Sequence, residues 1–227
     1  MDQSSDGSQE LGREHLAALD VLRITKNLFF WLAIVAIVAQ VGSWYVVRHT
    51  DKLDNADRAI TVGEASSPTQ AEIDLSRRWA RGTESAVSLA GFVGRVSVVM
   101  VGGLMVLALL VSLSARLGGA AGITRAVRWS LLALALLVPW DTLTPGAVSR
   151  IPAAFCSFDE LNDVRYREIS ATAADNGDGA VTWSETARFS LYPLVLAVVL
   201  VASQLSFRGG YRKIVLSPVT RLPLHEV

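Results

Sequence analysis

The sequence contains few of the residues on which most catalytic and metal sites depend. It has one cysteine, Cys156, and three histidines that are far apart in the chain, His15, His49 and His225. A single cysteine excludes an intramolecular disulfide. The sequence also lacks HExxH, GxSxG, CxxC and glycine-rich phosphate-binding motifs. We therefore expect a protein that is not an enzyme and has no catalytic residue, and we expect Cys156 to be a packed thiol.

Charged residues are scarce in four long parts of the sequence. Apolar residues make up 51% of the chain, and they are clustered rather than periodic. The clusters occupy residues 28–47, 89–114, 126–143 and 189–207. A helix needs about 20 apolar residues to cross the hydrocarbon core of a bilayer. The sequence therefore predicts an all-α integral membrane protein with four transmembrane helices.

Two alternatives would also account for apolar runs of this kind. Helices of a soluble bundle carry a polar stripe where they meet water, and the segments LAIVAIVA and VLAVVLVA have none. The first run has the alternative of a cleaved signal peptide, since Arg23 and Lys26 precede it. That run is longer than a typical signal-peptide core, and no small-x-small cleavage site precedes Trp44. We interpret it as a retained span.

Basic residues predict how these spans are oriented. The segment ARLGGAAGITRAVR, which joins the second run to the start of the third, contains Arg116, Arg125 and Arg128 and no acidic residue. Basic residues also precede the first run and follow the fourth. Since lysine and arginine concentrate in cytoplasmic loops, we expect both termini to be cytoplasmic. The resulting organisation is a cytoplasmic segment 1–26, a membrane domain 27–207 with extracytoplasmic loops 48–88 and 144–188, and a cytoplasmic tail 208–227.

The segments outside the spans carry their own local signals. We expect the polar residues 1–10 to be disordered and residues 11–26 to form an amphipathic helix at the membrane surface. Each outer loop is predicted to contain a short helix. One follows Pro68 and runs toward the second span, and the other begins near Ser157, a capping residue followed by Glu160.

Composition also bears on location and partners. Only three of the 21 basic residues are lysine, Lys26, Lys52 and Lys213. Together with the abundance of alanine, valine and glycine, this favours a GC-rich bacterial genome, and hence the bacterial plasma (inner) membrane. The formal net charge is zero and no basic cluster has interleaved aromatic residues. We therefore expect the lipid bilayer and other membrane proteins, or a second copy, as partners, and no nucleic acid.

A few polar and small residues within the spans are candidates for helix packing. Arg95 is the one strongly charged residue well inside an apolar run, and we expect it to reach the outer headgroups by snorkelling rather than to form a buried ion pair. Gln40 and Gln204 are expected to hydrogen-bond between helices. Small residues at Ala90, Gly94, Gly102 and Gly103, and at Gly118, Gly119 and Gly122 in the inner loop, would allow close helix approach.

One short stretch carries a metal-binding pattern. An EF-hand loop takes calcium ligands from positions 1, 3, 5, 7, 9 and 12, with glycine at position 6. With Gly179 at position 6, the ligand positions are Asn176, Asp178, Ala180 through its carbonyl, Thr182 and Glu185. Residues 174–185 therefore resemble an EF-hand calcium-binding loop, which implies Ca²⁺ as a cofactor. The resemblance covers this stretch alone.

The stretch departs from the EF-hand pattern at position 1, where Ala174 offers no carboxylate. Asn-Gly and Asp-Gly are also strong turn formers, so a plain turn is the alternative. The predicted extracytoplasmic location favours calcium, since a weak site with a dissociation constant of about 10⁻⁴ to 10⁻³ M fills there. The helix that leaves the loop would then be the fourth span itself.

Three functions are compatible with these features. The first is a non-enzymatic multi-pass membrane protein that acts as a scaffold or accessory subunit of a membrane assembly. The second is a calcium-responsive membrane sensor or regulator that uses the stretch 174–185. The third, a component of a membrane transporter or enzyme, requires a polar cavity that the sequence does not indicate.

Overall fold

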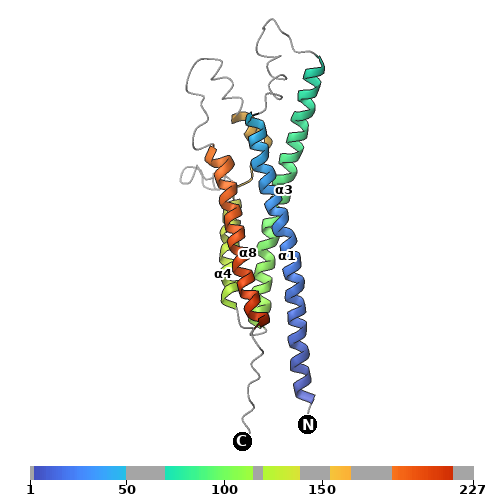
Figure 1. Ribbon diagram of the computed structural model, residues 1–227, viewed down its shortest axis with the longest axis vertical. Coiled ribbons are helices and arrows are strands. Elements are labelled where there is room, and N and C mark those ends of the chain that lie inside the picture. Colours follow the sequence, from blue (N-terminus) through green and yellow to red (C-terminus); the bar gives the residue numbers. More distant parts are fainter. Residues whose placement is uncertain (1–2, 50–69, 115–119, 139–153, 165–185, 217–227) are drawn as a thin grey trace. The chain divides into compact units, whose positions relative to one another are not determined.

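The computed structural model describes residues 3–49, 70–114, 120–138, 154–164 and 186–216, and all the regular structure in these ranges is helical. The helices in chain order are α1 (Gln3–His49), α3 (Gln70–Ser114), α4 (Ala120–Leu137), the π-helix η3 (Ala187–Leu191) and α8 (Tyr192–Leu216) (Figure 1). A further short helix covers 158–164.

Four helices are long and apolar enough to cross a membrane, which confirms the prediction of four candidate spans. They are Glu14–Val47, Arg77–Ser114, Ala120–Leu137 and Ala187–Val215. Large apolar side chains are exposed along them, among them Trp31, Val38, Phe92 and Val198. In water this exposure would be costly, whereas a lipid environment suits it.

Two of these helices are much longer than a span requires. α1 has 47 residues and α3 has 45, so each is about 70 Å long, roughly twice the thickness of the hydrocarbon core. The prediction of disorder for residues 1–10 is wrong for the described residues 3–10, which belong to α1. Extending an existing helix by a residue costs far less than starting one, so the apolar part of α1 supports its polar beginning.

Other helix ends also differ from the hydropathy boundaries. The third run was predicted as a span over 126–143, but α4 begins at Ala120 and ends at Leu137. Pro139 explains the earlier end, since proline disfavours helical backbone in the residue before it. Gly122 is consequently in α4 rather than in the inner loop, and α8 extends past the predicted end at residue 207 to Leu216.

The predicted helix near Ser157 is confirmed by its cap. The backbone N–H of Glu160 donates to the Ser157 hydroxyl at 3.3 Å, and the N–H of Leu161 donates to the Ser157 carbonyl at 3.4 Å. Ser157 therefore occupies the N-cap of the helix 158–164, with Glu160 three residues later.

The chain divides into two compact units. Unit 1 comprises Met1–Trp31, Ser97–Leu136 and Ala197–Val227, and unit 2 comprises Leu32–Val96 and Leu137–Leu196. In unit 1, Asp20 contacts Tyr211 while Lys26 contacts Gln204. Because rising numbers on α1 meet falling numbers on α8, these two helix segments are antiparallel.

The contact between α4 and α8 in unit 1 is unusually close. A Cβ atom built on Gly122 would lie 2.6 Å from the Cα of Gly210, so the two backbones meet where neither residue has a side chain. One turn further along α4, the carbonyl of Ala126 accepts a hydrogen bond from the hydroxyl of Ser203 on α8 at 3.0 Å. Small residues thus permit the helix approach that the sequence predicts for Gly122.

Unit 2 is centred on an apolar cluster that includes the short segment 154–164. Its buried members are Trp44, Val87, Cys156, Leu161, Val164 and Phe189, with Phe158 packed against them. The rings of Trp44 and Phe189 stack with centroids 4.7 Å apart. Residues from α1, α3, η3 and the 154–164 segment therefore share one core.

Candidate functional site

Unit 1 contains a pocket of about 380 Å³ between α1 and α8. Half of its lining residues are basic: Arg23 and Lys26 on α1, and Arg208 and Arg212 on α8. The other four are Asn27, Phe207, Tyr211 and Val215. On each helix these residues are three or four positions apart, so they share one face. We call these eight residues the basic pocket.

Lys26 is the buried basic residue of the pocket, with a side chain only 1% exposed. Its ammonium donates to Oε1 of Gln204, and its Nζ lies 4.2 Å from the centroid of the Phe207 ring. The amide nitrogen of Gln204 donates in turn to Oδ1 of Asn27 at 2.7 Å. This confirms that Gln204 hydrogen-bonds between helices. The partners of the lysine charge are neutral groups.

Negative charge is scarce around the pocket. Asp20 accepts a hydrogen bond from Nη1 of Arg23 at 3.4 Å and another from the hydroxyl of Tyr211 at 3.2 Å. The guanidinium of Arg23 also lies 4.8 Å from the centroid of the Tyr211 ring. No lining residue is acidic, and in the described ranges no carboxylate pairs with Lys26, Arg208 or Arg212. The chemistry of the pocket is that of an anion-binding site.

In unit 2, polar side chains on α1 and α3 hold the 154–164 segment. Nε2 of the buried Gln40 donates to the carbonyl of Cys156 at 3.3 Å and also contacts the Cys156 sulfur. Nη2 of Arg95 donates to the carbonyl of Phe155 at 3.1 Å. Arg95 therefore bonds to a carbonyl of the 154–164 segment, no ion pair of Arg95 occurs among the described residues, and its snorkelling to the headgroups stays a prediction. A guanidinium in the middle of α3 can satisfy a carbonyl that its neighbours leave unpaired.

Cys156 is held in a setting that suppresses thiol chemistry. Its side chain is buried and free of any disulfide. Burial raises the pKa of the Cys156 thiol to about 11; the Gln40 hydrogen bond opposes this rise, and the nearby carboxylate of Glu160 adds to it by a smaller amount. Since the thiolate is the nucleophile, the geometry agrees with the prediction of a packed thiol.

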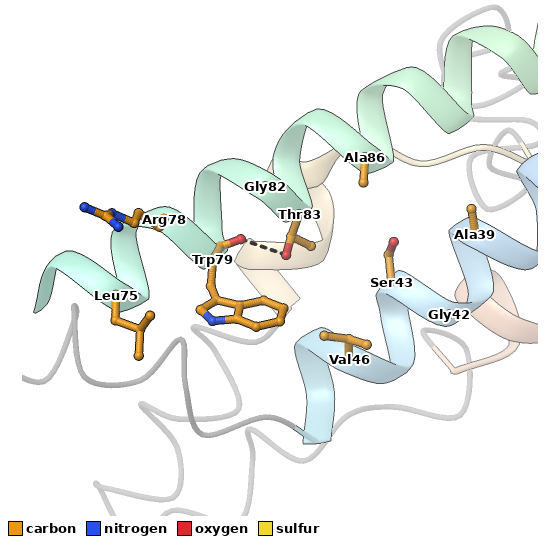
Figure 2. A pocket seen from close by; sticks show the side chains of 10 residues that line it. All are labelled: Ala39, Gly42, Ser43, Val46, Leu75, Arg78, Trp79, Gly82, Thr83 and Ala86. Carbon is orange, nitrogen blue, oxygen red and sulfur yellow. Dashed lines mark hydrogen bonds between the residues drawn. The ribbon is translucent and has the colours of Figure 1, made fainter. Parts of the chain in front are cut away.

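Unit 2 also has an open groove between α1 and α3, with a volume of about 530 Å³. Ten residues line it: Ala39, Gly42, Ser43, Val46, Leu75, Arg78, Trp79, Gly82, Thr83 and Ala86. Figure 2 shows the side chains of Ser43 and Val46 on one side of the groove and those of Trp79 and Thr83 on the other. The Thr83 hydroxyl donates to the carbonyl of Trp79 at 2.9 Å, which leaves the wall mostly apolar. We call this the α1–α3 groove.

The glycines that the structure describes differ in how closely other residues approach them. A Cβ atom on Gly94 would collide with the ring of Phe155, one on Gly102 would lie 2.9 Å from Leu134, and one on Gly122 would strike Gly210. These three are required by packing within the chain. Gly42 and Gly82, in the α1–α3 groove, would have nothing within 4 Å of an added Cβ. Packing within the described residues does not require glycine at these two positions.

The predicted calcium ligands Asn176, Asp178, Ala180, Thr182 and Glu185 lie outside the described residues, so the EF-hand resemblance stays a prediction. Within the described ranges there is no group of three or more histidine, cysteine, aspartate or glutamate side chains placed to hold a metal ion. The sequence interpretation did not identify the basic pocket, because it treated Lys26 as one of the residues flanking the first span. The burial of Lys26 depends on Gln204 and Phe207, which are about 180 positions away in the sequence.

We found no family model that matches the sequence, and no characterised protein or solved structure that is significantly similar to it.

Proposed function

We propose that this protein is a non-enzymatic subunit or scaffold of a membrane assembly in a bacterial plasma membrane, and that the α1–α3 groove receives a helix of a partner membrane protein. Both termini are cytoplasmic in this proposal. The antiparallel contact of α1 with α8 in unit 1 supports that orientation, as do the basic residues beside the first and fourth spans. Reporter fusions at Ser4 and Glu226 should both give a cytoplasmic signal.

The observation that carries the proposal is the pair of glycines in the groove. Glycine inside a helix costs roughly 0.5–1 kcal/mol relative to alanine. Gly94, Gly102 and Gly122 offset that cost by close packing within the chain, whereas Gly42 and Gly82 have no such contact with the described residues. Small residues at helix contacts let backbones approach closely in membranes. A helix from another protein, packed against Gly42 and Gly82, would give these positions the same role.

The remaining groove residues suit such a contact. Ala39, Gly42, Ser43 and Val46 follow one another at helical spacing on α1, and Gly82, Thr83 and Ala86 do so on α3. Trp79 supplies a large aromatic surface at one side of the groove (Figure 2). Small, apolar and weakly polar groups of this kind pack against a helix without leaving a buried charge unpaired.

The test is co-purification of the full chain from its native membrane in a mild detergent. Gly42→Leu and Gly82→Leu should each reduce the recovery of associated membrane proteins at least tenfold, because the larger side chain fills the groove. Gly103→Leu is the matched control, since Gly103 also has nothing within 4 Å of an added Cβ but is not in the groove. All three variants should keep the far-ultraviolet circular dichroism of the natural protein.

A photoreactive residue in place of Ser43 identifies the occupant directly. An adduct with a different polypeptide, lost in Gly82→Leu, would support the proposal. A product of twice the chain's mass would show self-association at the groove and contradict a partner of another kind. Unchanged co-purification in both glycine variants, with lipid adducts alone at position 43, would refute the proposed docking role.

A further inference from the structure

Among the described residues, the basic pocket of unit 1 has more positive charge than nearby carboxylates balance. Four cationic side chains, those of Arg23, Lys26, Arg208 and Arg212, line a space of about 380 Å³ with no acidic residue in its wall. Asp20 lies nearby and is bonded to Arg23 and Tyr211. Gathering like charges in a partly buried space is costly unless an anion joins them.

The pocket also has the donors that a phosphate group requires. Arginine presents several N–H groups in a planar arrangement that matches phosphate oxygens, and lysine adds a point charge. Arg208 and Arg212 are exposed and are one helical turn apart on α8. The ammonium of Lys26 is held in place by Gln204 and the Phe207 ring, so a donor at the base of the pocket is already positioned.

The setting of the pocket distinguishes a lipid phosphate from a free one. The pocket lies on α1 and α8, two of the candidate membrane spans. Apolar side chains adjoin the basic ones: Phe207 and Val215 line the pocket itself, and Ile24, Leu28 and Leu205 are exposed on the same two helices. A ligand with a charged head and apolar chains would contact both kinds of surface, whereas inorganic phosphate would use the basic residues alone.

We propose that the basic pocket binds the phosphate headgroup of an anionic phospholipid between α1 and α8. Arg208 and Arg212 contact the phosphate from α8, Arg23 and Lys26 contact it from α1, and the acyl chains follow the exposed apolar residues. Basic pockets between transmembrane helices are a known means of recognising anionic lipids. A zwitterionic lipid binds less well, because its ammonium group would be brought beside four positive side chains.

The experiment measures lipid binding to delipidated full-length protein in detergent by native mass spectrometry. The ligands are dioctanoyl phosphatidylglycerol, dioctanoyl phosphatidylcholine and inorganic phosphate. We expect phosphatidylglycerol to bind at least tenfold more tightly than phosphatidylcholine. The double variant Arg208→Gln/Arg212→Gln should lose this tenfold preference. The matched control Arg125→Gln/Arg128→Gln removes two exposed arginines from α4 that do not line the pocket, and it should keep the preference.

Each other outcome contradicts the proposal in a distinct way. Equal loss of binding in the α4 control would mean that net charge, rather than the pocket, attracts the lipid. Displacement of phosphatidylglycerol by millimolar inorganic phosphate would identify a site for free phosphate. Equal binding of the two lipids would exclude headgroup recognition. The Arg208→Gln/Arg212→Gln protein should have the circular dichroism and melting temperature of the natural protein in detergent without lipid, because both side chains are exposed.

Discussion

In unit 1 the helices bond to one another directly, whereas in unit 2 they bond to a segment inserted beside them. The polar contacts of unit 1 join α1 to α8 through Lys26, Asn27 and Gln204, and α4 to α8 through Ser203. In unit 2, Gln40 of α1 and Arg95 of α3 donate to backbone carbonyls of residues 155 and 156. The two units thus satisfy buried polar groups in different ways.

The glycines show the same contrast. In unit 1, Gly122 meets the backbone of Gly210, although Gly102 meets the Leu134 side chain, while in unit 2 Gly94 meets the Phe155 side chain. Two backbones in contact can move apart only if whole helices shift, but a ring can rotate or withdraw. The comparison indicates that unit 1 depends on fixed helix spacing, and that unit 2 depends on how well the 154–164 segment fills the space beside its helices.

The open spaces of the two units differ in charge. The basic pocket of unit 1 is lined by arginine and lysine, and the α1–α3 groove of unit 2 by small and apolar residues with one arginine, Arg78. A pocket with uncompensated charge favours an anion, and an apolar groove favours another helix. This is why we assign a lipid to the first and a protein partner to the second.

The largest effect is expected from breaking the backbone contact of unit 1. In Gly122→Ala the new Cβ would lie 2.6 Å from the Cα and 2.8 Å from the nitrogen of Gly210, and α4 must move to relieve the clash. We expect a loss of about 3 kcal/mol, at the upper end of the range for overpacked sites. Thermal unfolding in detergent, followed by circular dichroism, measures it.

Two alanine variants provide the comparison for Gly122→Ala. Gly94→Ala should cost less, about 1–2 kcal/mol, because the Phe155 ring that it meets can shift. Gly103→Ala meets nothing within 4 Å and should be neutral or stabilising by up to about 1 kcal/mol. If Gly94→Ala proved as harmful as Gly122→Ala, the distinction between a fixed and an adaptable unit would be wrong.

A smaller effect concerns the Cys156 thiol, which the 154–164 segment of unit 2 keeps buried in the folded protein. Burial raises the pKa of the Cys156 thiol from 9.0 to about 11, so Cys156 has roughly 100-fold less thiolate when folded than when unfolded at pH 7.5. Maleimide labelling of the folded protein in detergent should therefore be at least a hundredfold slower than after unfolding. The rate should keep rising with pH above 9, where the unfolded thiol is already mostly ionised.

Gln40→Leu tests which contact protects the thiol. It removes the donor to the Cys156 carbonyl, a hydrogen bond worth about 1 kcal/mol, so labelling of the folded protein should become about fivefold faster. Gln204→Leu is the matched control, since it removes a buried glutamine from unit 1. Faster labelling in the control as well would mean that the two units open together.

Hydropathy predicted the four spans because apolar side chains are clumped, and that signal needs no knowledge of tertiary structure. It could not predict helix ends, which depend on local backbone effects such as Pro139 and on the cooperativity that extends α1 to Gln3. The sequence predicted that polar residues within the spans form hydrogen bonds, but it did not predict which residues are their partners. Gln204 does bond between helices, but Gln40 bonds to a loop carbonyl, and only the fold brings Arg208 beside Lys26.

The smallest effect concerns calcium and would add a difference between the units, because the stretch 174–185 lies in the sequence of unit 2. A site with a dissociation constant of about 1 mM, typical of weak extracellular sites, gives only about 0.6 kcal/mol of stabilisation at 2 mM calcium. Ala174→Asp supplies the missing carboxylate at position 1 and should tighten binding. Asp178→Ala and Glu185→Ala each remove an in-register carboxylate and should abolish it.

Terbium luminescence sensitised by Trp183, which lies within the stretch, provides the titration, with displacement by calcium as the check of specificity. The expected order of affinity is Ala174→Asp first, the natural sequence second and Glu185→Ala last. Asp175→Ala is the matched control, because position 2 of an EF-hand loop contributes no ligand. If Ala174→Asp binds no more tightly than the natural sequence, the EF-hand register is wrong. The residues DNGDG then act as a turn, for which Asn-Gly and Asp-Gly are sufficient.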